Sequence, residues 1–120
     1  MGVAVKRIDI EGVKPSPQEL LDRALAMVPT LKARAKGCTQ ARNIPAETIA
    51  EMKAAGFFRI LQPANFGGYE MHPNDFFEVQ KVLAEGCMST GWMYGVLGCH
   101  PYEMALFHEK AQQEVWGDDP

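Results

Sequence analysis

The chain has 120 residues, a length that suits one domain with a single packed core. Its hydrophobic content of 47% and charged content of 22% are ordinary for a globular protein. A formal net charge of -3 offers no electrostatic basis for binding nucleic acid or an anionic membrane surface. No apolar run approaches the roughly 18 residues of a membrane-spanning helix, so no membrane partner is expected.

Three cysteines, Cys38, Cys87 and Cys99, stand at unrelated spacings. They predict reduced thiols in a cytoplasmic protein rather than a disulfide framework. Cys87 and Cys99 together with His100 lack the close spacing of zinc ligands, so no metal site is expected.

Residues 1–14 are expected to form an extended leader, and residues 15–120 the folded domain. The segment Pro15-Ser16-Pro17 marks a helix start, because serine caps a first turn and proline fits within it. Apolar residues at helical spacing then predict a helix over about 17–36. Pro29 lies inside this helix and is expected to kink or divide it.

A second helix is expected to open at Asn43-Ile44-Pro45-Ala46-Glu47, which offers a cap, a proline and an acidic first turn. Gly56 is a good C-terminal stop for it. A short apolar segment follows, and the proline and paired glycines of residues 62–68 predict a loop.

Three further helices complete a predicted all-α fold of about five helices. They are expected over 73–86, from Ser89-Thr90 to about Cys99, and over 102–116, with a break at His100-Pro101. No strand is expected. The residues expected on the buried sides of the first and last of these three helices are Phe76, Phe77, Val79, Val82, Leu83, Met104, Leu106, Phe107 and Val115.

The stretch from Gly86 to Tyr102 has no carboxylate, lysine or arginine. A helix without charge on any side must be surrounded by protein, so this helix is expected to be the most buried. Gly91, Gly95 and Gly98 fall at i, i+4 and i+7 and share one face. Each glycine costs about 1 kcal/mol relative to alanine inside a helix. The stripe therefore serves either a close helix crossing or a space for a flat ligand.

Trp92 and His100 are the candidate functional side chains of this stretch. Trp92 flanks the glycine stripe and offers a large rigid surface, either to the core or to an aromatic ring. Because His100 precedes Pro101, it is expected where two helices meet, as a cap, a core residue or an acid–base group. His72 and His108 are expected at the surface.

Several segments resemble the N-terminal helical domain of acyl-CoA dehydrogenases. They are Ile44-Pro45-Ala46-Glu47-Thr48, Ala55-Gly56-Phe57-Phe58, Leu61-Gln62-Pro63 and Phe66-Gly67-Gly68. A narrower resemblance is to the two-component flavin-dependent aromatic hydroxylases of that superfamily, of the p-hydroxyphenylacetate and secosteroid phenol hydroxylase types. It is carried by Ser89-Thr90-Gly91-Trp92, Gly98-Cys99-His100 and the segment from Ala111 to Pro120. The resemblance covers nearly all of residues 16–120.

The resemblance implies the N-terminal helical domain of a longer chain. It further implies that a β-sheet domain and a C-terminal helical bundle follow, hold most flavin contacts and build a homotetramer. A separate flavin reductase supplies reduced FMN or FAD, which reacts with molecular oxygen to give a C4a-hydroperoxide. This electrophile hydroxylates a phenolic substrate ortho to its hydroxyl, in a pathway such as steroid degradation.

By the same resemblance, His100 is the base that removes the phenol proton, which raises the electron density of the ring where oxygen attacks. Pro101, directly after this histidine, departs from the family pattern and bears on the pose of the imidazole. These roles favour the ligand explanation of the glycine stripe. The residues expected at the flavin are Ser89, Gly91 and Trp92, and those expected at the substrate are Tyr94 and Gly95.

Two alternatives stay open. One is a fragment of an acyl-CoA dehydrogenase, which oxidises a thioester with FAD and takes its glutamate base from the C-terminal part of the chain. It has no need of Trp92 and His100. The other is a stand-alone helical interaction module, which would pack the charge-free helix inside a self-sufficient core. Either enzyme fragment would instead expose an apolar surface.

Overall fold

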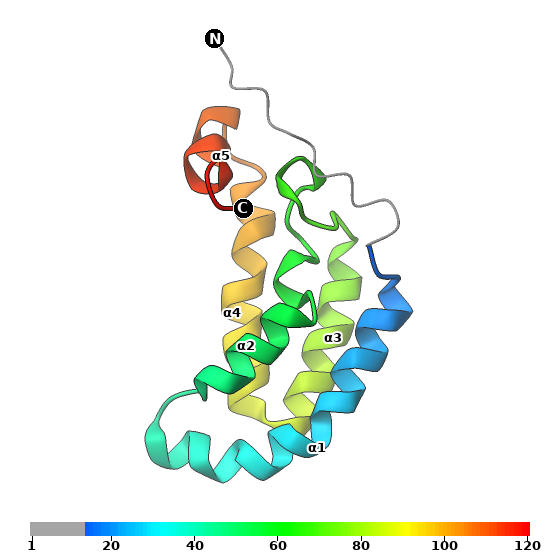
Figure 1. Ribbon diagram of the computed structural model, residues 1–120, viewed down its shortest axis with the longest axis vertical. Coiled ribbons are helices and arrows are strands. Elements are labelled where there is room, and N and C mark those ends of the chain that lie inside the picture. The colour runs from blue at the N-terminus through cyan, green and yellow to red at the C-terminus, as the bar shows by residue number, and fades with distance from the viewer. Residues whose placement is uncertain (1–13) are drawn as a thin grey trace.

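The computed structural model describes residues 14–120, so the expected leader lies, apart from Lys14, outside the described residues. Within 14–120 the chain forms α-helices and two short 3-10 helices but no strand, which confirms the predicted all-α fold. Helix α3 packs against α1 on one side and α4 on the other, and α2 lies across them (Figure 1). The elements are α1 (Pro17–Ala41), α2 (Ala46–Ala54), η1 (Phe57–Arg59), η2 (Ala64–Phe66), α3 (Pro73–Gly86), α4 (Met88–Met104) and α5 (Glu109–Trp116).

Helix α1 begins with the predicted cap and runs longer than expected. Ser16 Oγ accepts a hydrogen bond from Glu19 N, and Glu19 Oε2 accepts one from Ser16 N. The helix continues to Ala41 and ends where Arg42 takes the left-handed conformation, at φ 52°. Pro29 remains inside it. An internal proline bends a helix, and α1 changes direction near its middle (Figure 1).

Helix α2 ends as expected, because Gly56 adopts φ 87°, a conformation that side-chain-bearing residues avoid. Its start differs from the prediction. The N-cap is Pro45, without a side-chain cap, and Asn43 Oδ1 accepts its hydrogen bond from Ile44 N instead. Residues 62–68 form the predicted loop, with η2 inside it.

Helix α3 spans the predicted residues, and His72 caps it by accepting a hydrogen bond from Asn74 N at Nδ1. Phe77, predicted inward, is half exposed. The predicted break at His100-Pro101 is wrong. Helix α4 continues through these residues to Met104. A proline removes only one helical hydrogen bond, and Ala105 N still donates to Pro101 O at 3.1 Å.

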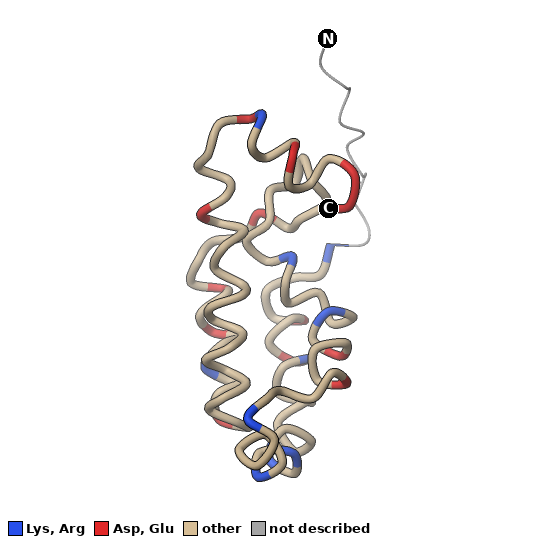
Figure 2. Tube along the Cα trace, turned by 90° about the vertical axis from the view of Figure 1, so that its left-hand side faces the viewer, with Lys and Arg blue, Asp and Glu red and all other residues tan. Residues whose placement is uncertain are grey.

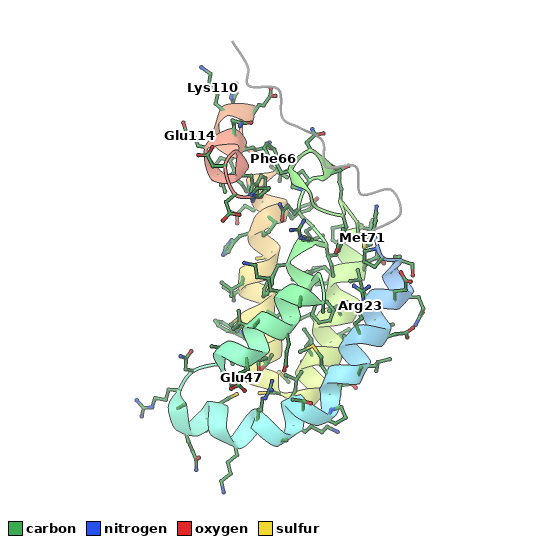
Figure 3. All side chains as sticks on the ribbon, viewed as in Figure 1. Arg23, Glu47, Phe66, Met71, Lys110 and Glu114 are labelled. Atoms are coloured by element: carbon green, nitrogen blue, oxygen red, sulfur yellow. The ribbon has the colours of Figure 1, made fainter. Side chains whose placement is uncertain are left out.

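Helix α5 is shorter than predicted and begins at Glu109, capped by His108 Nδ1. The prediction that Leu106, Phe107 and Val115 point inward is wrong, since all three are exposed. Trp116 is the buried residue of α5 and makes a tilted ring contact with Phe66 at 5.2 Å between centroids. Phe66 lies directly beside α5 (Figure 3).

The core lies between α1, α3, the inner side of α4 and the α2–η1 segment. Its fully buried large side chains are Leu20, Leu31, Met52, Phe57, Ile60, Phe76, Val79, Leu83 and Tyr94. None of the helices over residues 14–120 combines the length and apolar character that a membrane crossing needs.

Candidate functional site

The glycine stripe of α4 faces α3. A methyl group added at Gly91 would lie 2.6 Å from Ala84 Cα, and one added at Gly98 would collide with the ring of Phe76. At Gly95 it would collide with the side-chain amide of Gln80, which donates a hydrogen bond to Gly91 O. The stripe therefore serves a close helix crossing. Its interpretation as space for a flat ligand is wrong, because α3 fills that space.

Tyr94, expected at the substrate, is a core residue in the structure. It is 0% exposed, its hydroxyl donates to Phe57 O at 2.9 Å, and its ring stacks on Phe76. Burial raises the pKa of the Tyr94 phenol well above its ordinary value. Its hydroxyl is therefore a neutral donor committed to the fold.

The opposite side of α4 is open, contrary to the prediction that this helix is the most buried. Trp92 is 69% exposed, and Val96 and Leu97 are exposed with it. Figure 2 faces this side of the molecule, where the α4 trace carries no charge between residues 87 and 102. We define the open side of α4 by Met88, Ser89, Trp92, Val96, Cys99, His100 and Glu103, all exposed and all within one half of the helix circumference.

The domain exposes further large apolar residues. Outside the open side, Tyr102 near the end of α4 is exposed, as are Leu106, Phe107 and Val115 in the α5 region. Isolated domains rarely expose so many large apolar residues together. An exposed apolar surface, as expected of an enzyme fragment, is thus present, and α4 is not enclosed in the core as expected of an interaction module.

Three of the residues predicted at the site share the open side. Ser89 and Trp92 stand one turn apart, and His100 follows about 12 Å further along the helix axis, at about 1.5 Å per residue. The predicted set therefore divides. Ser89, Trp92 and His100 lie on an accessible surface, whereas Gly91 and Tyr94 are buried and the half-buried Gly95 faces α3.

His100 lies inside helix α4, not at the predicted junction of two helices. Its Nδ1 lies 3.1 Å from Glu103 Oε2, one turn further along, and both side chains are about two-thirds exposed, at 62% and 65%. Glu103 was not among the predicted site residues, because a helix break was expected at His100-Pro101. The i,i+3 spacing of a histidine and a glutamate was the available signal.

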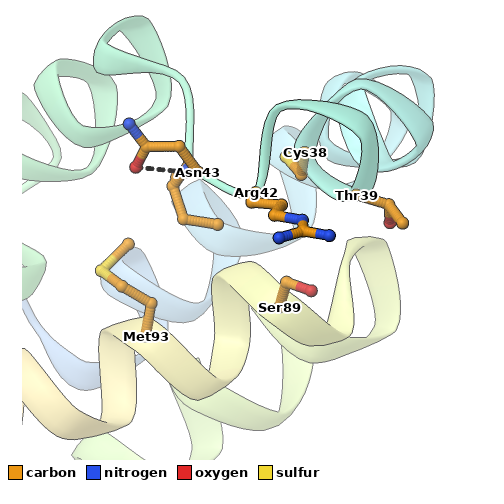
Figure 4. A pocket seen from close by; sticks show the side chains of 7 residues that line it. Cys38, Thr39, Arg42, Asn43, Ser89 and Met93 are labelled. Carbon is orange, nitrogen blue, oxygen red and sulfur yellow. Dashed lines mark hydrogen bonds between the residues drawn. The ribbon is translucent and has the colours of Figure 1, made fainter.

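A cavity of about 400 Å³ opens at the amino-terminal end of α4, where the end of α1 approaches it. Figure 4 shows Arg42, Asn43 and Thr39 around one side of the cavity and Ser89 and Met93 on α4 around the other. Ser89 therefore borders both this cavity and the open side. The remaining lining residues are Cys38 and Ile44.

The two buried thiols near this end of α4 differ in their ionisation. Burial raises the pKa of Cys38. Burial also acts to raise the pKa of Cys87, but hydrogen bonding to Thr90, Cys38 and the Ser89 backbone together outweighs it and leaves the pKa lowered. Neither thiol is exposed, so Cys99 is the accessible thiol of the chain, and it lies on the open side.

Comparison with known proteins identifies the domain. The sequence profile of the acyl-CoA dehydrogenase N-terminal domain matches residues 18–118. The chain belongs to this family. Among curated members, it is 39% identical over 99 residues to the oxygenase subunit HsaA of a flavin-dependent monooxygenase from Rhodococcus jostii, a match that covers 82% of the chain. It is 32% identical over 112 residues, or 93% of the chain, to the oxygenase component of p-hydroxyphenylacetate 3-hydroxylase from Acinetobacter baumannii.

Solved structures of family members agree with the fold. The crystal structure of the HsaA monooxygenase from M. tuberculosis superposes with a TM-score of 0.85 at 39% identity, over 88% of this chain and 29% of that one. The chain spans about a quarter of the length of its curated relatives, at 26% of the Rhodococcus protein and 25% of the Acinetobacter protein. Within this family, its relatives are oxygenase components of aromatic hydroxylases.

Proposed function

We propose that this chain is the helical amino-terminal part of an oxygenase component that hydroxylates a phenolic substrate ortho to its hydroxyl group. Reduced FMN or FAD and molecular oxygen are the co-substrates, and a flavin C4a-hydroperoxide supplies the oxygen atom. The observation that carries the proposal is the open side of α4, where Trp92 and His100 lie exposed on a surface that carries no charged residue before Glu103.

The open side suits a flavin ring system. Trp92 presents its indole outward from a helix that has no charged residue before Glu103, and a flat aromatic ring stacks well on such a surface. The Ser89 hydroxyl, one turn away, is available as a hydrogen-bond partner for a polar edge of the flavin. Trp92 and Ser89 are therefore the residues of this chain that would hold the flavin.

His100 is placed to act on the substrate. A phenol reacts with an electrophilic oxygen faster as phenolate, so a base that removes its proton accelerates the transfer. His100 is the only histidine on the open side, and its Nε2 is not engaged by any other described residue. We assign His100 the role of this base, with the phenol bound between it and the flavin.

The proposal includes partners that lie outside the chain. A flavin reductase component delivers the reduced flavin, as the two-component organisation of the relatives suggests, and the whole oxygenase is a homotetramer. The exposed apolar residues of α4 and α5 are where the remaining domains would pack. The three free thiols fit the cytoplasmic location proposed with it.

Replacing His100 with Asn in the oxygenase-length protein tests the proposal. Asparagine preserves size and polarity but cannot accept the phenol proton, so hydroxylation should slow by about 10²–10⁴-fold, the usual contribution of a general base. Rapid mixing of the reduced enzyme with oxygen and substrate separates oxygen activation, which should be unchanged, from oxygen transfer.

His72→Asn and His108→Asn are the matched controls. Both histidines cap helices through Nδ1, and asparagine is a good capping residue, so these variants should hydroxylate at the parent rate. A His100→Asn enzyme that hydroxylates at the parent rate would refute the assigned base. An enzyme that instead oxidises acyl-CoA thioesters would support the dehydrogenase alternative.

A further inference from the structure

The three histidines of this chain use Nδ1 in two opposite ways. In His72 and His108, Nδ1 accepts a hydrogen bond from a backbone N–H, of Asn74 at 3.1 Å and of Lys110 at 3.1 Å. In His100, Nδ1 faces a carboxylate oxygen of Glu103, also at 3.1 Å. A backbone N–H group needs an acceptor nitrogen as its partner, whereas a carboxylate oxygen needs a donor N–H.

The partner determines which ring nitrogen carries the proton. An ionised carboxylate is only an acceptor, so His100 Nδ1 must donate and therefore carries hydrogen. In the neutral imidazole this leaves the lone pair on Nε2. The backbone N–H at His72 and His108 requires the reverse, with the lone pair on Nδ1 and hydrogen on Nε2.

We propose that Glu103 is a positioning residue for His100. It holds the imidazole in the Nδ1–H tautomer, so that Nε2 points its lone pair away from the helix as the proton acceptor. When Nε2 takes a proton from a phenol, the adjacent carboxylate also stabilises the imidazolium that results, as carboxylates do beside other catalytic histidines. This role rests on the function proposed above, whereas the tautomer itself does not.

The helix makes this pairing possible. Residues three apart lie one above the other on a helix, so Glu103 reaches His100 without leaving the open side. The continuation of α4 through Pro101 is therefore required. A helix that ended at His100 would leave Glu103 in another element and His100 without this partner.

Nitrogen NMR of the chain labelled with ¹⁵N-histidine measures the tautomers directly. At a pH where the imidazoles are neutral, one signal pair should show the Nδ1–H tautomer and two the Nε2–H tautomer, and His100→Asn should remove the former. Glu103→Ala should convert His100 to the Nε2–H form, and Glu103→Gln, whose amide oxygen still accepts, should retain much of the Nδ1–H form. An Nε2–H tautomer for His100 in the parent protein would overturn the inference.

Kinetics of the oxygenase-length protein with its reductase supply the second readout. Glu103→Ala should slow oxygen transfer by roughly 10- to 100-fold, the range seen when the carboxylate partner of a metal-ligating histidine is removed, with the KM for the phenol unchanged. In the His100→Asn background the same change should have no further effect, because Glu103 acts only through His100. Glu85→Ala, which removes an exposed carboxylate from α3, should leave the rate unchanged.

The two sets of variants separate the possible failures. If His100→Asn slows transfer and Glu103→Ala does not, His100 is the base but Glu103 does not position it. If His100→Asn has no effect, the proposed base is wrong, whatever tautomer the NMR reports. If Glu103→Ala slows transfer equally with and without His100, Glu103 acts by another route and the inference is wrong.

Discussion

Tyr94 connects two parts of the core through one hydrogen bond. Its hydroxyl is fully buried and donates to Phe57 O at 2.9 Å, which ties α4 to the η1 turn. The neighbouring Phe57 and Phe76 rings enclose the phenol at centroid distances of 6.1 and 4.8 Å. A buried carbonyl that loses its donor has no water to replace it, so removing this hydrogen bond should lower the stability of the domain.

Tyr94→Phe should therefore destabilise the domain by about 1–3 kcal/mol, because it leaves the Phe57 carbonyl unpaired while preserving the ring packing. Urea denaturation of parent and variant measures the difference. Tyr102→Phe is the control, since Tyr102 is half exposed and its hydroxyl is open to water. If Tyr94→Phe leaves the stability unchanged and weakens substrate binding in the longer protein, the result would contradict the structural role and support the predicted substrate role.

At the scale of elements, the crossing of α3 and α4 depends on absent side chains. The helices approach so closely at Gly91 that its missing side chain would stand 2.6 Å from Ala84 Cα, a backbone atom that cannot move aside. Each glycine destabilises the helix by about 1 kcal/mol relative to alanine, but the absent side chains allow α3 and α4 to approach this closely. Their crowded side also fixes which half of α4 is open.

Gly91→Ala should separate the two helices and cost about 1–3 kcal/mol, the usual range for overpacking a core. Gly37→Ala in α1 is the matched control. No atom lies within 4 Å of its added methyl group, so alanine should stabilise the helix by up to about 1 kcal/mol. Thermal denaturation of the two variants should move in opposite directions. A shift in the same direction would show that the crossing tolerates a methyl group.

A second contact between elements joins the far end of α1 to α2. Arg34 donates from both terminal nitrogens to Glu51, at 2.7 and 3.1 Å, and also to Thr48 Oγ1. The hydrogen bond and the charge of Arg34 lower the pKa of Glu51, although partial burial opposes this. The carboxylate is therefore favoured in the folded state.

The contribution of Glu51 to stability should depend on pH in a defined direction. Because its pKa is lower in the folded than in the unfolded chain, the stabilisation is present above about pH 4.3, the ordinary value for glutamate, and is lost as the pH falls through the folded value. Glu51→Gln should thus lower Tm at pH 7, and its Tm should converge with that of the parent once the pH has fallen below the lowered folded pKa of Glu51. The difference at pH 7 should shrink in 1 M salt. A difference that persists at low pH would contradict the ion-pair origin.

At the scale of the whole molecule, one long side is left apolar. The domain measures 51 × 29 × 22 Å, and its core is concentrated around α3, so α4 and α5 contribute only their inner sides. The two tryptophans report on this asymmetry. Trp92 projects from the open side, whereas Trp116 is buried against Phe66.

Acrylamide quenching of fluorescence should therefore resolve two tryptophan populations. In the 120-residue chain, Trp92→Phe should remove the readily quenched emission, and Trp116→Phe should leave it. In the oxygenase-length protein the quenching of Trp92 should fall, because the proposed domains and flavin cover the open side. Equal accessibility of Trp92 in the two proteins would argue that nothing packs on this surface.

Local signals in the sequence determined much of the helical frame. Ser16 before a proline and Gly56 after a helical pattern act within one turn of the backbone, so their meaning does not depend on what packs around them. The same holds for the start of α3 at Pro73. The family resemblance of Ser89-Thr90-Gly91-Trp92 was also readable, since it lies in the residues themselves. Together these determined an all-α domain and its family.

Only the tertiary structure decided which side of α4 is open. A helix with no charge has no polar side to orient it, and glycines alone do not indicate whether a neighbouring helix or a ligand fills the space beside them. In the structure α3 packs against the glycines and so determines the orientation of α4. As a result Trp92 is exposed and Tyr94 is buried. The passage of α4 through Pro101 was likewise seen only in the structure, because a proline can either end a helix or remain inside it at the loss of one hydrogen bond. That passage brings Glu103 to His100.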